Sequence, residues 1–245
     1  MRPDDEYYLL TDLRGADYRG DFYFCGRAGN GWADELAFTG ADASESSLRK
    51  GVVEHSVAAV KGDVCICQRD LTLSKNAPCT GDPLHWVHHD REKGRRTSKS
   101  SAFWRVIGRT LREFYGSAVP EMWSSAVVWS NLYKLGPQNG GNPPSDLRSA
   151  QLPAALDLLR RELLEHRPRW AVFLTEVDAN RGWFKPFSAG LGFRAATRSP
   201  FPYVSAAGLL TIDGLTAKLI VAEHPQTRNE GVFAESLIKA IAQPG

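Results

Sequence analysis

Three short apolar runs stand apart along the chain, and each ends in glycine or polar residues. They occupy residues 21–26, 126–131 and 170–175. Uninterrupted apolar runs of this length are typical of strands that are buried on both faces. Over 101–115 and 152–166, apolar residues recur at helical spacing, which predicts amphipathic helices. Strands separated by helices predict an α/β fold with a central, largely parallel twisted sheet and helices on both faces.

The carboxyl-terminal part predicts a hairpin and a closing helix. Apolar residues at 209–212 and 215–222 flank Asp213-Gly214, a dipeptide typical of tight hairpin turns. A helix is expected from about residue 230 to 241. In the helix predicted over 152–166, Pro153 is expected in the first turn, where its missing N–H is tolerated.

Composition indicates an ordinary folded protein. Of 245 residues, 42% are hydrophobic and 24% charged, so one domain is expected over 1–245, with 40–100 as an irregular, insertion-like segment. The net charge of +2 means that any nucleic-acid affinity must come from a local patch. No stretch approaches the roughly 18 apolar residues of a membrane helix. We expect no signal peptide and no disulfide framework from the four cysteines, and therefore a cytoplasmic protein without membrane contact.

Polar clusters follow three of the predicted strands. They are Gly26-Arg-Ala-Gly-Asn-Gly-Trp32, Ser130-Asn131 and Glu223-His224-Pro225-Gln226. Because the carboxyl ends of parallel strands meet at one edge of a sheet, we expect these clusters to come together. A single histidine before proline, or an asparagine at a strand end, is more often structural. Their joint placement favours a functional site.

The content and order of these clusters resemble the uracil-DNA glycosylase superfamily. In that family a strand leads into Gly-Gln-Asp-Pro-Tyr or a variant, and then into a phenylalanine on which the base stacks. Residues 22–32 and Phe38 are similar. The family's base-reading asparagine closes an apolar strand, as Asn131 does here, and its His-Pro-Ser motif is similar to His224-Pro225-Gln226. The resemblance covers about residues 20–240.

The resemblance implies a monofunctional DNA glycosylase, which flips a base out of DNA and hydrolyses its N-glycosidic bond to leave an abasic site. His224 would stabilise the departing base anion, and Asn131 would read the Watson–Crick edge. Phe38, and Trp32 as a second candidate, would stack on the base. No cofactor is implied. Because the family's tyrosine side wall is missing, the base can be uracil or a bulkier modified base such as a modified cytosine of phage DNA, in repair or in antiviral defence.

The chain departs from the family where the attacking water is positioned. The usual Asp or Asn, two residues after the glycine, is Ala28. We expect Asn30 to hold the water, with Asp34 and Glu35 as weaker candidates, although Asn30-Gly31 reads equally well as a simple turn. Ala28 also favours a second hypothesis, a non-catalytic DNA- or base-binding protein of the same fold.

Contacts to the DNA partner are expected from two segments. Pro225, Gln226 and Arg228 follow His224, and Arg228 stands where many family members place a leucine wedge, so it would act as a wedge or as a phosphate ligand. The second segment is the basic stretch 91–112, which reads as a phosphate-binding face or as a solvated loop and helix face. Its cationic residues include Arg95, Arg96, Lys99, Arg105, Arg109 and Arg112.

Two further groups carry reactive side chains. The cysteines and histidines between 65 and 89 are potential zinc ligands, but Cys65-x-Cys67 is not a Cys-x2-Cys knuckle, so we expect no metal. Lys134 can in principle form a Schiff base. We expect it instead to contact phosphate or to be an exposed loop lysine.

Overall fold

The computed structural model describes residues 6–9, 12–28, 37–39, 84, 87, 88, 100–137, 141–176 and 182–243. Its helices are α3 (Ala102–Tyr115), α4 (Ser145–His166), α5 (Lys185–Ser188) and α6 (Glu230–Ala242). Its strands are β1 (Glu6–Leu9), β2 (Leu13–Arg14), β3 (Phe22–Ala28), β4 (Ala37–Thr39), β5 (Val127–Tyr133), β6 (Leu135–Pro137), β7 (Trp170–Glu176), β8 (Phe193–Arg198), β9 (Val204–Ile212) and β10 (Leu215–Glu223). None of these helices is long and apolar enough to cross a membrane.

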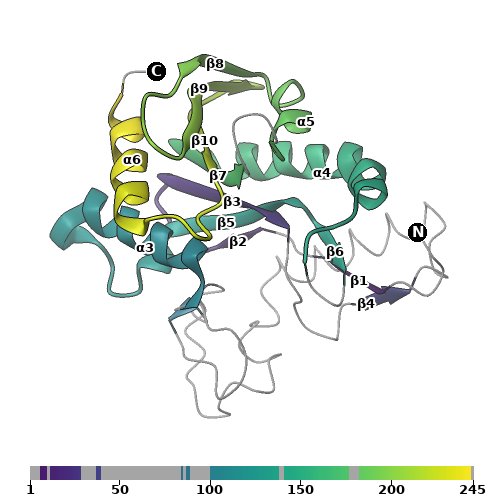
Figure 1. The fold of residues 1–245 in the computed structure, drawn as a ribbon, viewed down its shortest axis with the longest axis horizontal. Helices are drawn as coiled ribbons and strands as arrows, with labels where there is room; N and C mark the ends of the chain where they lie inside the picture. The colour runs from purple at the N-terminus through teal and green to yellow at the C-terminus, as the bar shows by residue number, and fades with distance from the viewer. Residues whose placement is uncertain are drawn as a thin grey trace, which may run out of the picture.

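A seven-stranded sheet forms the centre of the fold, in the order β2-β5-β3-β7-β10-β9-β8 (Figure 1). The four central strands β5, β3, β7 and β10 run parallel, whereas β2, β9 and β8 pair antiparallel with their neighbours. The predicted α/β class is confirmed, but the sheet is mixed rather than largely parallel. The difference arises at both edges. β2 pairs antiparallel with β5 at one edge, and at the other β8, β9 and β10 follow one another through short connections, which allow only antiparallel pairing.

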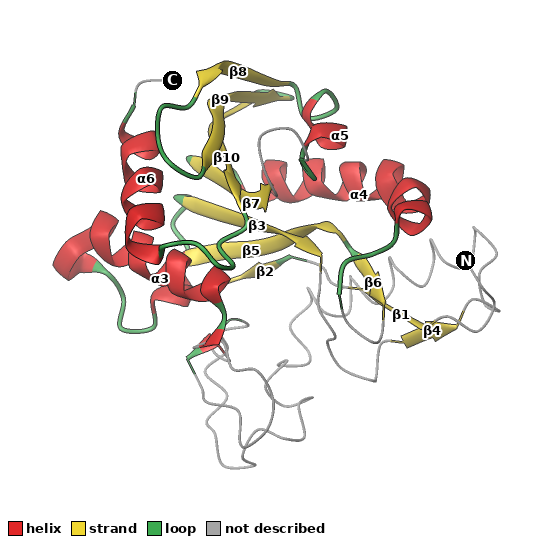
Figure 2. Ribbon diagram, viewed as in Figure 1, coloured by secondary structure: helices red, strands yellow, loops and turns green. Residues whose placement is uncertain are grey.

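Helices cover both faces of the sheet, as predicted (Figure 2). On one face, here called the α3 face, α3 and α6 pack against Phe22 and Phe24 of β3. On the other, the α4 face, α4 and α5 pack against Tyr23 and Cys25 of the same strand. Successive strand residues point to opposite faces. Because both faces are covered, the strand reads as an uninterrupted apolar run.

The predicted hairpin is present between β9 and β10. Asp213 and Gly214 have φ values of 41° and 81°, and a type I′ turn requires positive φ at both positions. The prediction for α4 was wrong at its start, because the helix begins at Ser145 and Pro153 lies inside it. The first two turns are polar, and the burial of Leu147 there is too isolated to form a periodic pattern.

A second sheet, with three strands in the order β4-β1-β6, was not predicted. Phe38 lies in β4 of this sheet, where its backbone pairs with Tyr7. β6 follows β5 after Lys134 alone. Of the insertion-like segment 40–100, the structure describes residues 84, 87, 88 and 100.

Candidate functional site

The three polar clusters lie at the carboxyl edge of the central strands. Gly26 of β3 is the register partner of Asn131 in β5. The backbone N–H of His224, directly after β10, donates to Glu176 O at the end of β7 at 2.7 Å. Asn131 does not close its strand as predicted, since β5 continues to Tyr133. The fold therefore brings Gly26, Asn131 and His224 to one edge of the sheet.

Asn131 is buried with an incomplete set of hydrogen bonds. Its side chain is 2% exposed, and among the described residues its Nδ2 has no hydrogen-bond partner. A Cβ added at Gly26 would lie 2.5 Å from Asn131 Oδ1, so the carboxamide requires glycine at the neighbouring position. A buried donor without a partner costs about 1–3 kcal/mol. An acceptor on a ligand would remove that cost.

His224 is a neutral histidine in this environment. Burial, and then the nearby Arg27 cation, lower its pKa from 6.5 to about 4. Its Nδ1 accepts a hydrogen bond from the Gln226 backbone N–H at 3.3 Å. A neutral imidazole that accepts at one nitrogen carries its proton on the other. Nε2 of His224 is therefore a hydrogen-bond donor at neutral pH.

Arg27 supplies a fixed positive charge between the ends of β3 and β7. Its Nε donates to Thr175 O at 2.7 Å and its Nη2 to Glu176 O at 2.8 Å. Glu176 O also accepts from the backbone N–H of His224, so the guanidinium and the start of the His224 loop share one acceptor. Burial lowers the pKa of Arg27, and the Glu176 carboxylate acts against this shift.

Phe103, in the first turn of α3, lies between His224 and the Gly26–Asn131 pair. Its ring is 6.4 Å from the His224 ring, centroid to centroid, with an angle of 28° between the planes. On the other side, its Cε2 would lie 3.5 Å from a Cβ at Gly26. With 8% of its surface exposed, Phe103 provides an aromatic face between Asn131 and His224.

Lys134 belongs to a separate buried network on the α4 face. Its Nζ lies 2.5 Å from Glu162 Oε1 and donates to Ser130 Oγ at 2.6 Å. Ser130 and Tyr23 donate their hydroxyl hydrogens to Glu162 Oε2 at 2.8 and 2.5 Å. Lys134 is 3% exposed, so the prediction of an exposed loop lysine or a phosphate contact was wrong. The side chain folds inward because Glu162 offers it a buried counter-charge.

The remaining predicted residues divide into two groups. Pro225 is buried, Gln226 is exposed, and Arg228 forms an ion pair with Glu223 at 2.7 Å and lies over the Tyr203 ring. Ala28 packs against the core of the α4 face. For Phe38 the structure describes the backbone alone. Outside the described residues lie Asn30, Trp32, Asp34, Glu35, Arg95, Arg96 and Lys99.

No group of three or more His, Cys, Asp or Glu side chains within the described ranges is arranged to hold a metal ion. Among the potential zinc ligands between residues 65 and 89, only His88 falls in these ranges.

Comparisons with protein-family models and with curated proteins identify no relative. No protein-family model matches the chain, and no curated protein matches it. The resemblance to uracil-DNA glycosylases therefore stays an interpretation of the motifs.

Two residues of this site were missed from sequence. Arg27 stands inside the first motif, directly after Gly26, and a cation at the end of a predicted parallel strand is a recognisable signal. Phe103 occupies an apolar position of an amphipathic helix, and its place beside His224 follows from tertiary packing alone.

Proposed function

We propose that the chain is a DNA glycosylase of the uracil-DNA glycosylase type, acting on uracil or on a modified base flipped out of DNA. The observation that carries the proposal is the buried, unpaired Nδ2 of Asn131 at the same edge of the sheet as a neutral His224. A pyrimidine presents carbonyl oxygens and a ring nitrogen at its edge. An amide can donate to and accept from such an edge at once, which allows it to select among bases.

The reaction needs stabilisation of the departing base. Water adds its oxygen to C1′ of the sugar while the C1′–N bond breaks, and the bonding electrons leave with the base. The attacking water loses one proton to solvent, and the released base takes one up. Negative charge grows on the base oxygen during this step. The Nε2–H of His224 can donate to that oxygen, and the Arg27 cation lies close enough to His224 to lower its pKa. Donors aimed at developing charge are typically worth a factor of about 10²–10³ each.

The attacking water is assigned to the loop after β3. Ala28 has no polar atom and packs against the α4-face core, so it does not replace the usual Asp or Asn. Asn30 stays the candidate for this role, with Asp34 and Glu35 as weaker candidates. The same observation favours the second candidate function, a protein that binds DNA or a flipped base without cleaving it.

An alkali-cleavage assay separates these functions. The purified protein is incubated with uracil-containing DNA and, separately, with phage DNA that carries modified cytosines, and each sample is then heated in alkali. Strand breaks in either DNA, absent with His224→Ala, are expected of a glycosylase. Intact strands with DNA binding retained would support the non-catalytic function. If the protein neither cleaves nor binds these DNAs, both candidate functions are contradicted.

A further inference from the structure

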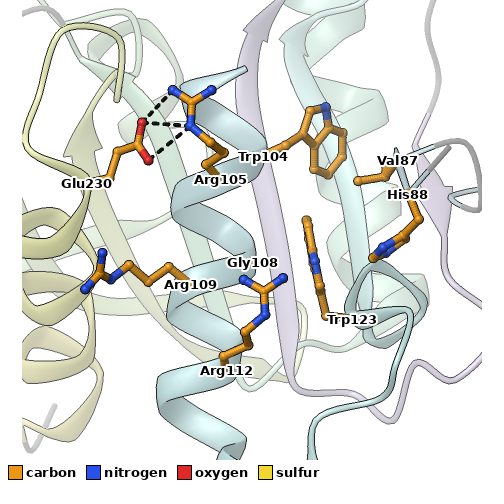
Figure 3. Close-up of a pocket in the computed structure, with 9 residues that line it drawn as sticks. All are labelled: Val87, His88, Trp104, Arg105, Gly108, Arg109, Arg112, Trp123 and Glu230. Atoms are coloured by element: carbon orange, nitrogen blue, oxygen red, sulfur yellow. Dashed lines mark hydrogen bonds and ion pairs between the residues drawn. The ribbon is translucent and has the colours of Figure 1, made fainter. Parts of the chain in front are cut away.

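A cavity of about 500 Å³ lies against α3 (Figure 3). Three arginines of one helix face, Arg105, Arg109 and Arg112, line one side of it. Trp104 and Trp123 line the other side, and the Trp123 ring lies so close to Gly108 that a Cβ there would be 2.7 Å from the indole. The cavity thus combines an apolar floor with a row of guanidinium groups.

The charges of this cavity are only partly neutralised. Arg105 forms a bidentate ion pair with Glu230, with the closest N–O distance at 2.6 Å. Arg109 pairs with Glu113, one turn further along α3, at 3.0 Å. Within the part of the chain that the structure describes, the Arg112 side chain has no acidic partner. A single exposed pair such as Arg109–Glu113 contributes at most about 1 kcal/mol, so an incoming anion can compete for it.

The cavity adjoins the candidate site through α6. Asn229 caps this helix at the end of the loop that begins with His224. The next two residues meet the arginines directly: Glu230 pairs with Arg105, and a Cβ at Gly231 would lie 3.3 Å from the Arg109 guanidinium. Phe103, two residues before Arg105 in the first turn of α3, contacts the His224 ring. One helix therefore links the strand-end site to the row of arginines.

The spacing of the arginines suits a nucleic-acid strand. Positions 105, 109 and 112 share one helix face and span about 10 Å along its axis. Along the axis of duplex DNA each strand carries one phosphate charge per roughly 3.4 Å, so about 10 Å of axis holds about three charges of one strand. Guanidinium groups bind phosphate oxygens in bidentate fashion, and a low-dielectric indole floor strengthens such bonds.

We propose that the α3 cavity binds the phosphate backbone of DNA next to the flipped nucleotide, with Arg112 and Arg109 as the phosphate ligands. The ion pair of Arg105 with Glu230 competes with phosphate binding and limits the affinity for DNA. This assignment rests on the proposed function, because it places the bound strand relative to the His224 site. It concerns binding alone, so it can be tested without base excision.

The test is DNA binding of the full chain, measured by fluorescence anisotropy on a labelled duplex without uracil between 50 and 200 mM salt. The double variant Arg109→Gln/Arg112→Gln should raise the Kd roughly tenfold at about 100 mM salt. It should also reduce the slope of log K against log salt by about 2, because each lost phosphate contact removes about 0.9. Glu230→Gln, which removes an acidic side chain from the cavity, should act in the opposite direction and tighten binding.

The matched control is Arg160→Gln, since Arg160 is also an arginine in a surface ion pair, with Asp213 at 3.0 Å. It should leave the Kd and the slope unchanged. Wild-type-like binding by the double variant would overturn the proposal, even if the protein cleaves uracil DNA. A loss of binding confined to the arginine variants would support it, even if the wild type cleaves no base. A wild type that binds no DNA would overturn it as well.

Discussion

Ser130 and Asn131 are consecutive residues of β5, and they lead to opposite kinds of buried polar site. On the α4 face, Ser130 joins Lys134, Glu162 and Tyr23 in a network in which each polar side chain has a partner. On the α3 face, the Nδ2 of Asn131 is equally buried and has no partner among the described residues. Buried polar groups in folded proteins are nearly always hydrogen-bonded. We therefore assign the satisfied network to the structure and propose that the unsatisfied amide contacts a ligand.

The largest effect is expected from breaking the satisfied network. Glu162→Gln removes the counter-charge of the buried Lys134, which should lower the free energy of unfolding by about 3–5 kcal/mol. For a chain of this size, the loss corresponds to a decrease in Tm of roughly 6–20 °C. Thermal unfolding followed by circular dichroism measures it. The double variant Glu162→Leu/Lys134→Met, which removes both charges, should be clearly more stable than Glu162→Gln. Equal Tm values would mean that the ion pair is not the basis of the network.

A much smaller loss of stability is expected at Asn131. Asn131→Ala removes an amide nitrogen that has no partner, so the relief of its desolvation offsets part of the lost packing. The free energy of unfolding should change by less than about 1 kcal/mol in urea denaturation. A loss of 3 kcal/mol or more would show that this amide is part of the structure in the same way as Ser130, and the contrast between the two faces would fail.

The pH dependence of stability should report the neutral state of His224. The pKa of His224 is about 4 in the folded protein, against 6.5 for an ordinary histidine. The unfolded chain therefore takes up the proton first as the pH falls. The contribution of His224 to stability is thus complete above about pH 6.5 and is lost between pH 6.5 and 4. In His224→Gln this part of the decrease should be absent from unfolding curves recorded over the same range.

The smallest expected change is a shift in the pKa of His224 itself. Arg27→Gln removes a cation that lowers this pKa, so the titration midpoint should rise toward 6.5. The Cε1–H resonance of His224, assigned by comparison with His224→Gln, measures the midpoint by NMR. Arg160→Gln is the control and should leave it in place. A midpoint that Arg27→Gln does not move would mean that burial alone keeps His224 neutral.

The sequence predicts the central fold because its signals are local. The apolar runs of β3, β5 and β7 and the Asp213-Gly214 turn each contain the information that defines them. The three-stranded sheet has no such local signal, because β1, β4 and β6 are short and are defined by pairing between distant segments. Pro153 misled the prediction of α4, since proline is far more common in a first turn than inside a helix.

At the candidate site, the sequence predicted that Asn131 and His224 come to one edge of the sheet, because the carboxyl ends of parallel strands meet there. It could not identify Lys134 as buried, since its partner Glu162 lies 28 residues further along the chain. Nor could it show that the Ser130 hydroxyl has hydrogen-bond partners whereas the Nδ2 of Asn131 has none among the described residues. The difference between them depends on which hydrogen bonds are completed in three dimensions.

We propose that Asn131 hydrogen-bonds the flipped base, whereas the Ser130 network stabilises the fold. The most direct test is the rate of base release per folded molecule for wild type, Asn131→Ala and Ser130→Ala, measured on the DNA that the wild type cleaves. We expect Asn131→Ala to be at least 100-fold slower with little change in Tm, and Ser130→Ala to lose stability while its folded fraction keeps nearly the wild-type rate. Wild-type base release by Asn131→Ala would contradict the account.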